Sequence, residues 1–586
     1  MPNPDSRDGV TLAAHPGQRG VLLAFDLDEQ DPALRANLAG FAVRGQELAP
    51  NASAPFWLKN FLDFPPFDAS KSWEDSDRAP FQMFHWIHFP QHAEGRYRYT
   101  MWPVYFVPGQ DPKSPGGLRR DDAQSRTVEV SLRRRPAASF ELGFTRGFMS
   151  SQAYLNFTQK NGLTSGIKPD KQGQDHPRFD TQPFVLKYDW LGASARRLVA
   201  DFTARWADPA VTVDVFAYDL NEPDIIRAIG ALGARGRAIV DDSVASRKNA
   251  AGKVTKSGHG LPGSAESRAA KWLAQQGVTV KRLHFKRFSH DKVFVLRRNG
   301  VAEAVLTGSA NFSLRGFYVQ SNSVLLLDDA EVAGWYATAF EHAWAEPAKF
   351  ATRLIAKKWF APAAVPASLP PMRVSFAPHA APAFTVEDMA RRIRKAKESA
   401  LFSIMTPTGT GNALKVLTKD MVARQKFLLI GTTENRSGVK TFKSAVTSDS
   451  EIVPFAFLKA GTPPPFRAEL SGSEGGGGQH IHHKFVVLDF NGAKPTVYCG
   501  SSNLAAGGAT ANGDNLLEIN DRDVATAYAV EAIALYDHFR FRASQQAAKQ
   551  KKKPFTLAAD DGWTAEFYDK KKVKALQRKV YAKRTP

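Results

Sequence analysis

The 586-residue sequence predicts an α/β protein, in which an all-β sandwich precedes two pseudo-symmetric α-β-α domains. Short β-rich runs separated by Gly, Pro and Asp fill residues 20–135 and indicate the sandwich. Strand, helix and strand patterns follow one another over residues 211–243 and again over residues 400–432, which is typical of parallel sheets covered by helices. A 24-residue segment also recurs later in the chain, and such a repeat indicates two copies of one unit.

The N-terminal region combines β-strand patterns with aromatic residues suited to a small core. Its β-rich runs are VLLAFDLDE (21–29), LAGFAVRG (38–45), RYRYTMWPVYFV (96–107) and VEVSLRRR (128–135). We predict a fibronectin- or immunoglobulin-like sandwich over residues 19–138, after a flexible N-terminus over residues 1–18. The residues expected to fill its core are Trp57, Trp86 and Trp102.

Three histidines of this region, His85, His88 and His92, follow the pattern H-x2-H-x3-H. One interpretation is a metal site. The favoured interpretation is a strand edge, because a strand would point His85 and His88 to opposite faces. We therefore expect no metal ligands here, and no cofactor is indicated elsewhere in the sequence.

Composition shifts divide the rest of the chain. The Pro- and Ala-rich stretch FAPAAVPASLPP (360–371) predicts a linker over residues 359–372. This linker separates a first α-β-α domain over residues 139–358 from a second over residues 373–548. Residues 549–586 carry clustered lysines and are expected to form a basic, solvated C-terminal tail; the clustered residues are Lys551, Lys552, Lys553, Lys570, Lys571, Lys572 and Lys574.

Charge and cysteine content restrict the partners and the compartment. The net charge of +20 and the pI near 9.7 favour polyanionic partners such as nucleic acid or anionic lipid, although a solubilising surface would have the same composition. The single cysteine, Cys499, excludes an internal disulfide and fits a reducing compartment. No signal peptide and no long apolar segment is evident, so we expect a cytoplasmic protein that can act at a membrane surface.

The repeat is ungapped. HDKVFVLRRNGVAEAVLTGSANFS begins at His290 and HHKFVVLDFNGAKPTVYCGSSNLA begins at His482, a constant offset of 482 − 290 = 192 residues. Ten of the 24 positions are identical, and they include the His and Lys of H-x-K and the Gly, Ser and Asn of GSxN. We infer that both copies present the same chemical groups at the same places.

The spacing within each copy indicates a polar site at the edge of a buried strand. His and Lys of H-x-K lie on one face of a strand, and the apolar runs VFVL and FVVL predict that the strand continues into the core. A second strand would follow the Asn-Gly turn and end at GSxN, where Ser and Asn supply short hydrogen-bonding groups. The candidate residues are His290, Lys292, Ser309 and Asn311 in the first copy, and His482, Lys484, Ser501 and Asn503 in the second.

These paired motifs resemble the phospholipase D superfamily, or HKD family, whose signature is HxKxxxxD followed by GSxN. The resemblance covers residues 140–545, and the second copy is complete with Asp489 at the family's acidic position. The first copy departs from the family, because Arg297 stands where the family has Asp. His284, Lys286 and Asp291 also spell HxKxxxxD, but the constant offset and the distance to GSxN select His290.

The resemblance implies a double displacement without a metal. One histidine attacks phosphorus and forms a phosphohistidine, while the other protonates the leaving group and then activates water or an alcohol. Lys292, Lys484, Asn311 and Asn503, with Ser309 and Ser501, would bind the phosphoryl oxygens. Asp489 and Asp514 complete the expected set of catalytic residues, and Asp514 is expected to orient His482, which favours His482 as nucleophile; the family's usual assignment favours His290.

The expected substrate is a phospholipid, cleaved or transferred at its headgroup at a membrane surface. An HKD nuclease acting on DNA or RNA is the alternative, because the chain is strongly basic. A binding module that has lost activity is a third class, for which Arg297 is the supporting feature. Because one chain holds both motifs, a monomer is expected to complete the site.

Overall fold

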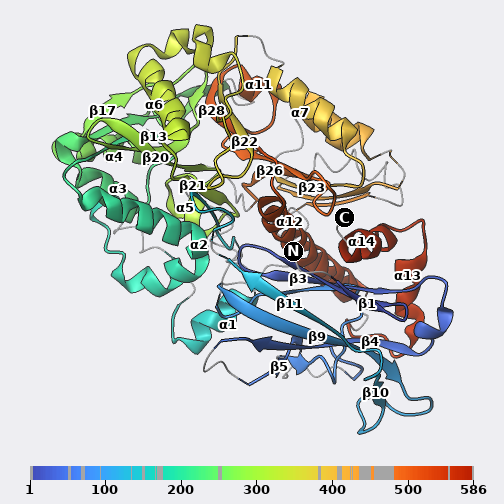
Figure 1. Cartoon of the computed structure of the whole chain (residues 1–586). Coiled ribbons are helices and arrows are strands. Elements are labelled where there is room, and N and C mark those ends of the chain that lie inside the picture. The colour runs from blue at the N-terminus through green and yellow to red at the C-terminus, as the bar shows by residue number, and fades with distance from the viewer. Residues whose placement is uncertain are drawn as a thin grey trace.

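The structure, a computed structural model, has α/β architecture with two further β-sheets at its N-terminal end (Figure 1). It describes the chain apart from residues 1–3, 50–53, 67–72, 93, 134, 148–151, 165, 168–175, 249–253, 381–383, 406–411, 423, 425, 435–449, 455–480, 552–554 and 584–586.

Two antiparallel sheets form the N-terminal region and share one apolar core. The first sheet contains β1 (Asp5–Arg7), β2 (Val10–Pro16), β3 (Val21–Leu27) and β8 (His85–His88). The second contains β10 (Leu118–Arg120), β9 (Gly95–Phe106), β4 (Leu38–Glu47) and β5 (Phe56–Trp57), with β11 (Arg126–Leu132) also paired to β9. Alternate residues of β2, β3, β4, β9 and β11 meet in the core between the sheets, as the period of two requires.

Two of the three tryptophans lie outside this core, contrary to the sequence-based expectation. Trp86 packs against the core and stacks on Phe81 with ring centroids 3.9 Å apart. Trp57 and Trp102 instead pair with each other, 5.3 Å apart, in a separate small cluster. Arg120 lies over both rings. The indole rings thus serve as a partly exposed cation–π partner, which the strand pattern alone did not reveal.

The N-terminus also differs from the expected flexible segment. β1 and β2 pair with each other, and β2 pairs along its full length with β3. Val10, Leu12 and Ala14 point into the sandwich core, while Ala13 points to a second core. Burial on both faces therefore orders residues that precede the predicted start of the sandwich.

Two large sheets follow, and they have the same strand order. The first runs β12 (Phe140–Phe144), β21 (Ser323–Leu327), β20 (Val301–Gly308), β19 (Lys292–Arg298), β13 (Val211–Ala217), β14 (Gly236–Val240) and β17 (Thr279–Arg282). The second contains β22 (Met372–Ala377), β28 (Asn512–Ile519), β27 (Thr496–Gly500), β26 (Lys484–Leu488), β23 (Ser399–Ile404), β24 (Leu428–Thr433) and β25 (Ser450–Pro454). In both, the last three strands are parallel and the others antiparallel.

Helices cover both faces of these sheets. The inner core contains residues of both sheets together with α6 (Ala330–Ala345) and α12 (Arg522–Gln550). The outer face of the first sheet packs against α2 (Val185–Ala204), α3 (Pro223–Gly230), α4 (Ala265–Gln275) and α5 (Leu314–Tyr318). The outer face of the second packs against α7 (Phe384–Lys395), α8 (Asn412–Lys415) and α11 (Ala506–Ala509).

The two H-x-K strands are buried on both faces, which explains their continuous apolar sequences. In β19, Val293 and Val295 enter the inner core, whereas Phe294 and Leu296 enter the outer one. β26 alternates in the same way between the inner core and the α7 side. Each strand therefore has its polar pair at its N-terminal end and apolar residues beyond it.

The C-terminal segment is folded, contrary to the expected solvated tail. α13 (Ala565–Tyr568) and α14 (Val573–Ala582) lie beside the N-terminal strands (Figure 1). Val580 and Tyr581 enter the inner core, and the buried Arg578 donates hydrogen bonds to the carbonyls of Phe567 (3.0 Å) and Leu27 (3.1 Å). Apolar residues spaced between the lysines thus anchor a segment whose composition suggested a tail.

No helix in the described part of the chain combines the length and the apolar character needed to span a lipid bilayer. Shorter elements include α1 (Gln152–Lys160), the pair β6 (Lys59–Asn60) and β7 (Glu74–Asp75), and the antiparallel pair β15 (Ala245–Lys248) and β16 (Val254–Ser257).

Candidate active site

Each H-x-K motif begins beside a strand of the opposite half. β18 (Phe288–Ser289), directly before His290, pairs in parallel with the start of β28. Ile481, directly before His482, forms a parallel bridge with Ser321, which lies just before β21. Equivalent pairings therefore carry each histidine from its own sheet to the edge of the other sheet, and the two motifs meet where the halves join.

His290 lies against Asp514 of the second half. Its Nδ1 is 2.7 Å from Asp514 Oδ1, and both side chains are buried. This corrects the expectation that Asp514 orients His482. The pairing of β18 with β28 places His290, and not His482, beside the start of β28. A carboxylate at Nδ1 fixes the ring orientation and directs Nε2 away from Asp514.

His482 has an amide partner at the matching place. Its Nδ1 lies 2.9 Å from Oδ1 of Asn322, and Asn322 precedes Asp514 by the same offset, 514 − 322 = 192 residues. Lys484 Nζ lies 3.1 Å from both ring nitrogens of His482 and donates to its carbonyl oxygen at 2.8 Å. The two imidazoles therefore differ chemically, one facing an acid and the other an amide.

The serines of GSxN form hydrogen bonds to the partners of the two histidines. Ser501 Oγ donates to Asp514 Oδ1 at 3.0 Å and accepts from the backbone N–H of Asn515. Ser309 Oγ donates to Asn322 Oδ1 at 2.9 Å and accepts from the Ser323 backbone. Because both hydroxyls are engaged in this way, the expected phosphate-binding role is corrected to one of fixing Asp514 and Asn322.

The asparagines of GSxN retain a buried acceptor without a partner. Asn311 and Asn503 each have an Oδ1 atom that is buried and makes no hydrogen bond among the described residues. Asn311 Nδ2 donates to Asp219 Oδ2 at 2.5 Å, so its second amide hydrogen is available to a ligand. These two amides remain suited to a polar ligand between the halves.

Asp489 lies away from the histidines, which corrects its expected catalytic role. It follows the last residue of β26, whereas Lys484 is the first. Its carboxylate accepts hydrogen bonds from three backbone N–H groups, those of Lys397, Glu398 and Ser399, at 2.7 to 3.0 Å. Asp489 therefore ties the end of β26 to the start of β23.

Arg297 holds the matching position in the first half by a different contact. Its guanidinium lies 2.8 Å from buried Asp214 on β13 and 3.0 Å from Glu341 on α6. The residue that departs from the family signature thus links β19 to its neighbours through an ion-pair network, away from the H-x-K end of the strand.

Burial sets the protonation of the site. It is the main cause that lowers the pKa of His290 and of His482 well below the usual value, and the nearby lysines lower both further. Burial also lowers the pKa of Lys292 to about 8 and that of Lys484 in the same direction. Burial raises the pKa of Asp514 to about 6, against the opposing effect of Lys292. Burial therefore favours the neutral form of both imidazoles and of Lys484, whereas a pKa of about 8 keeps Lys292 mostly charged at neutral pH.

A second group of polar residues adjoins His290, and the sequence reasoning missed it. Tyr218 and Asp219 directly follow β13, and Asp241 directly follows β14. The Tyr218 ring contacts the rings of His259 (4.5 Å) and His290 (4.8 Å) edge to face. Polar residues placed just after buried parallel strands were the available signal, since such strand ends meet at one edge of a sheet.

This group also contains metal-ligand chemistry. Ligand atoms of Asp219, His259 and Glu266 lie within 4.8 Å of one another. Both ring nitrogens of His259 already contact carboxylates, Nε2 at 3.1 Å from Asp219 and Nδ1 at 2.9 Å from Asp241. A proton shared in this way accounts for the cluster without an ion.

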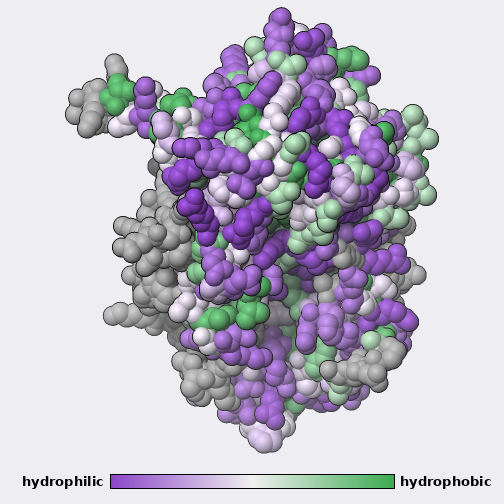
Figure 2. Space-filling model, turned by 90° about the vertical axis from the view of Figure 1, so that its left-hand side faces the viewer, coloured by the Kyte–Doolittle hydropathy of each residue, from purple (hydrophilic) through white to green (hydrophobic). Residues whose placement is uncertain are grey.

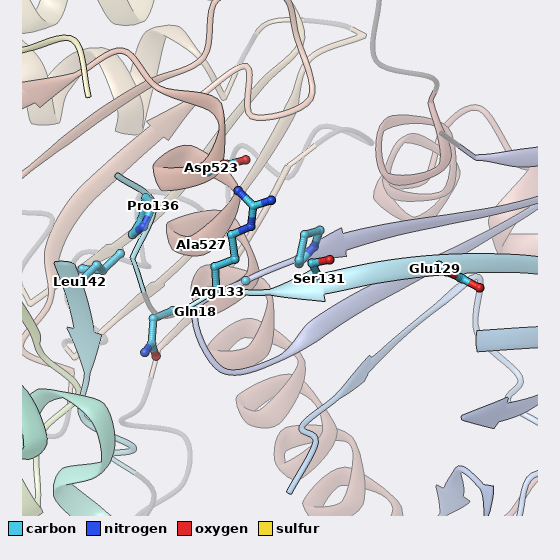
Figure 3. A pocket seen from close by; sticks show the side chains of 10 residues that line it. Gln18, Glu129, Ser131, Arg133, Pro136, Leu142, Asp523 and Ala527 are labelled. Atoms are coloured by element: carbon cyan, nitrogen blue, oxygen red, sulfur yellow. The ribbon is translucent and has the colours of Figure 1, made fainter. Parts of the chain in front are cut away.

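A cavity of about 310 Å³ lies elsewhere, between the sandwich and α12 (Figure 3). Gln18, Ser131 and Arg133 line it from the sandwich side, and Asp523 and Ala527 line it from α12. None of the H-x-K or GSxN residues lines this cavity.

Comparison with known proteins agrees with the motif geometry. Residues 207–344 match the family model described as "Cardiolipin synthase, PLD-like domain". No curated protein matches the chain. Among solved structures, the chain is similar to Nuc, a phospholipase D family member from Salmonella typhimurium (23% identity, 26% of this chain and 88% of that chain, TM-score 0.20).

Two further similar structures have lower identity. One is phosphatidylserine synthase from Haemophilus influenzae (11% identity, 65% of this chain and 90% of that chain, TM-score 0.37). The other is polyphosphate kinase from Porphyromonas gingivalis (10% identity, 86% and 74%, TM-score 0.36). Residues 207–344, which hold the first H-x-K and GSxN motifs, thus match a PLD-like domain, in agreement with the resemblance that the motifs show in the sequence.

Proposed function

We propose that this protein is a phosphodiesterase of phospholipase D type, which cleaves a phospholipid at its headgroup through a phosphohistidine on His290. The observation that carries the proposal is the pairing of His290 with Asp514 across the two halves, opposite His482 with its amide partner. A neutral imidazole with a carboxylate at Nδ1 is a nucleophile at Nε2, and a histidine without a carboxylate is the better proton donor.

The proposed reaction has two displacements. Nε2 of His290 attacks phosphorus, the bond from phosphorus to the leaving oxygen breaks, and His482 gives its proton to that oxygen. His482 then takes a proton from water, whose oxygen attacks phosphorus while the N–P bond breaks. An alcohol in place of water would give transfer in place of hydrolysis.

The positive charges next to the histidines support this sequence. Lys292 and Lys484 are buried at the start of their strands, and each lies beside the histidine of its own motif. A bound phosphodiester anion would favour the charged forms of both lysines and of His482, and so supply the proton that His482 must donate. Because these lysines would stabilise the developing negative charge, we expect activity without added metal.

We also propose that the two halves are duplicated domains related by a pseudo-twofold axis. Three observations support this: the constant offset of 192 residues, the equal strand order of the two sheets, and the equivalent pairings of β18 with β28 and of Ile481 with Ser321. One chain then supplies both halves of the site, which is consistent with a functional monomer.

A phospholipid is the proposed substrate, supported by the description of the matching family as cardiolipin synthase. Nucleic acid is the second candidate, favoured by the net charge of +20. The face of the molecule on which α3 and α4 lie is mostly hydrophilic (Figure 2). Residues 243–265, which include the β15–β16 hairpin, contain Arg247, Lys248, Lys253 and Lys256 and no acidic residue.

A paired assay separates the two candidates. The wild-type chain is incubated in EDTA with phosphatidylcholine vesicles and, separately, with single-stranded DNA. We expect release of choline, and loss of about 10³-fold or more in the variants His290→Ala and His482→Ala.

His284→Ala is the matched control. His284 is half-exposed, and it begins the alternative HxKxxxxD motif, which the 192-residue offset excludes. It should retain the wild-type rate. Cleavage of DNA alone would replace the lipid proposal with the nuclease. Full activity in either His290→Ala or His482→Ala would contradict the two-histidine mechanism.

A further inference from the structure

A continuous chain of hydrogen bonds runs through His259 and ends at two parts of the first-half site. At one end, Asp241 Oδ1 accepts the backbone N–H of Ser289 at 2.7 Å, directly before His290. At the other, Asp219 Oδ2 accepts Nδ2 of Asn311 at 2.5 Å. The imidazole of His259 joins the two carboxylates, with Nδ1 2.9 Å from Asp241 and Nε2 3.1 Å from Asp219.

We propose that His259 is a positioning residue of the phosphodiester site, which holds Asp219 against Asn311 and Asp241 against the backbone of the nucleophile's strand. This inference rests on the proposed function and deepens it, because it names a group outside the H-x-K and GSxN motifs on which the reaction depends. His259 acts through Asp219, Asp241 and the shared Tyr218 ring, without touching the reacting atoms.

The Asp219 end of this chain of contacts is particular to the half that holds His290, whereas the other end has a counterpart: Glu434, directly after β24, accepts the backbone N–H of Ile481 at 2.9 Å, as Asp241 does for Ser289. Ala217 of β13 pairs with Lys292, and Ile404 of β23 pairs with Lys484, so the residues that follow Ala217 and Ile404 are equivalent. Tyr218 and Asp219 follow in the first half, whereas Met405 and Thr406 follow in the second. The sequence of the second half therefore has neither a carboxylate nor an aromatic ring at these two positions, and the contacts of Asp219 and Tyr218 belong to the side of His290.

Charge balance explains why a histidine suits this place. Burial alone would lower the pKa of His259, but its hydrogen bonds with Asp219 and Asp241 outweigh burial and raise the pKa to about 10. Glu266 of α4 and the Tyr218 ring also face it, and Arg282 of β17 donates to its carbonyl oxygen at 2.7 Å. At neutral pH the ring is thus a cation that donates from both nitrogens and so joins the two carboxylates.

The backbone of His259 is held independently of its ring. Its carbonyl oxygen accepts hydrogen bonds from the hydroxyls of Ser264 (2.5 Å) and Ser267 (3.2 Å) at the start of α4. Replacing the ring therefore leaves the segment anchored, and the effect of a substitution reports on the carboxylates.

The test compares His259→Gln with His284→Gln. His284 is the matched control, because its Nδ1 contacts Asp242 at 2.6 Å, next to Asp241 in sequence, but it lies outside the chain of contacts. Both variants are assayed with a p-nitrophenyl phosphodiester. In His259→Gln we expect kcat to fall about 10- to 100-fold with little change in KM, because Gln cannot join both carboxylates. His284→Gln should match the wild type.

A pH profile separates positioning from a general loss of structure. His259 lowers the pKa of Asp219 against the opposing effect of burial, as do Lys292 and His290. The wild-type acid limb of kcat/KM is expected to follow Asp514, whose pKa is raised to about 6. Without the His259 cation Asp219 would protonate at a higher pH and add a second inactivating protonation, so the acid limb should become steeper and move to higher pH in His259→Gln. A loss of folded protein would lower the whole profile without moving this limb.

Orthovanadate binding provides a reading that does not depend on turnover. We expect His259→Gln to bind orthovanadate more weakly than His284→Gln in a calorimetric titration at pH 7.5, because Asn311 is no longer held. Equal kcat, equal acid limbs and equal orthovanadate affinity in the two variants would overturn the role of His259 alone. A wild-type chain that hydrolyses no phosphodiester would overturn the proposed function, and the titration would still decide the inference.

Discussion

His290 and His482 occupy matching places in the two halves but have different partners. Asp514 faces His290, and Asn322 faces His482 at the equivalent position. A carboxylate stabilises an imidazole that becomes cationic on attack, and an amide does so less. The difference of one side chain therefore assigns the two proposed roles, and it reverses the preference for His482 as nucleophile that the sequence suggested.

The pH profile should report Asp514 directly. Because burial raises its pKa to about 6, the carboxylate that holds His290 is lost as the pH falls through that value. The pKa of Lys292, lowered to about 8, predicts a second loss as the pH rises through 8. We expect wild-type kcat/KM to be bell-shaped between these limits.

Asp514→Asn should remove the acid limb, lower kcat about 10²-fold or more, and keep the alkaline limb. The two profiles are compared between pH 5 and 9. An unchanged acid limb in this variant would show that another group titrates there.

At the residue scale, the sequence placed the groups within one motif but not the contacts between the halves. The spacing of the repeat singled out His290, Lys292, His482 and Lys484, and the family resemblance added Asp514; their catalytic roles stay predictions. The partner of Asp514 was wrong, because an alignment of two copies does not reveal that their leading residues exchange sheets. The serines were misassigned for a related reason, since their hydroxyls face the histidine partners.

At the scale of elements, the C-terminal end of each H-x-K strand is held to a neighbouring strand by a different kind of contact. Asp489 accepts three backbone N–H groups at the start of β23, whereas Arg297 forms ion pairs with Asp214 and Glu341. Both arrangements join the H-x-K strand to its antiparallel neighbour, β26 to β23 and β19 to β13. A family position that is acidic in one copy and basic in the other is therefore structural, and the substitution is accommodated by the buried Asp214.

Asp489→Ala should lower the free energy of unfolding by about 2 kcal/mol, because three backbone donors lose a charged acceptor. Asp489→Asn keeps one acceptor oxygen and should cost less. Denaturant unfolding measures both, and the activity per folded molecule should remain at the wild-type level. A large loss of kcat in folded Asp489→Ala would instead return this residue to the catalytic set.

The whole molecule joins the two halves to a sandwich that both chain ends help to build. β2 lies between the sandwich core and the inner core, and α14 packs beside β2 and β3. The α/β architecture and the N-terminal β-sheets were predictable from periodicity, because the spacing of apolar residues along each strand reflects which of its faces are buried. The folded state of the described terminal segments was not predictable in this way, because their apolar residues are few and pack against residues that are distant in sequence.

The most direct test of the account is the identity of the covalent intermediate. His482→Ala is mixed with a p-nitrophenyl phosphodiester, whose leaving group needs no acid, so the first displacement proceeds and the second lacks its base. The reaction is stopped in alkali, and the phosphorylated residue is located by mass spectrometry. We predict a burst of p-nitrophenol equal to the enzyme concentration and, on His290, a phosphoryl group that still carries the second ester of the substrate. This group on any other residue, or no covalent adduct, would contradict the proposed mechanism.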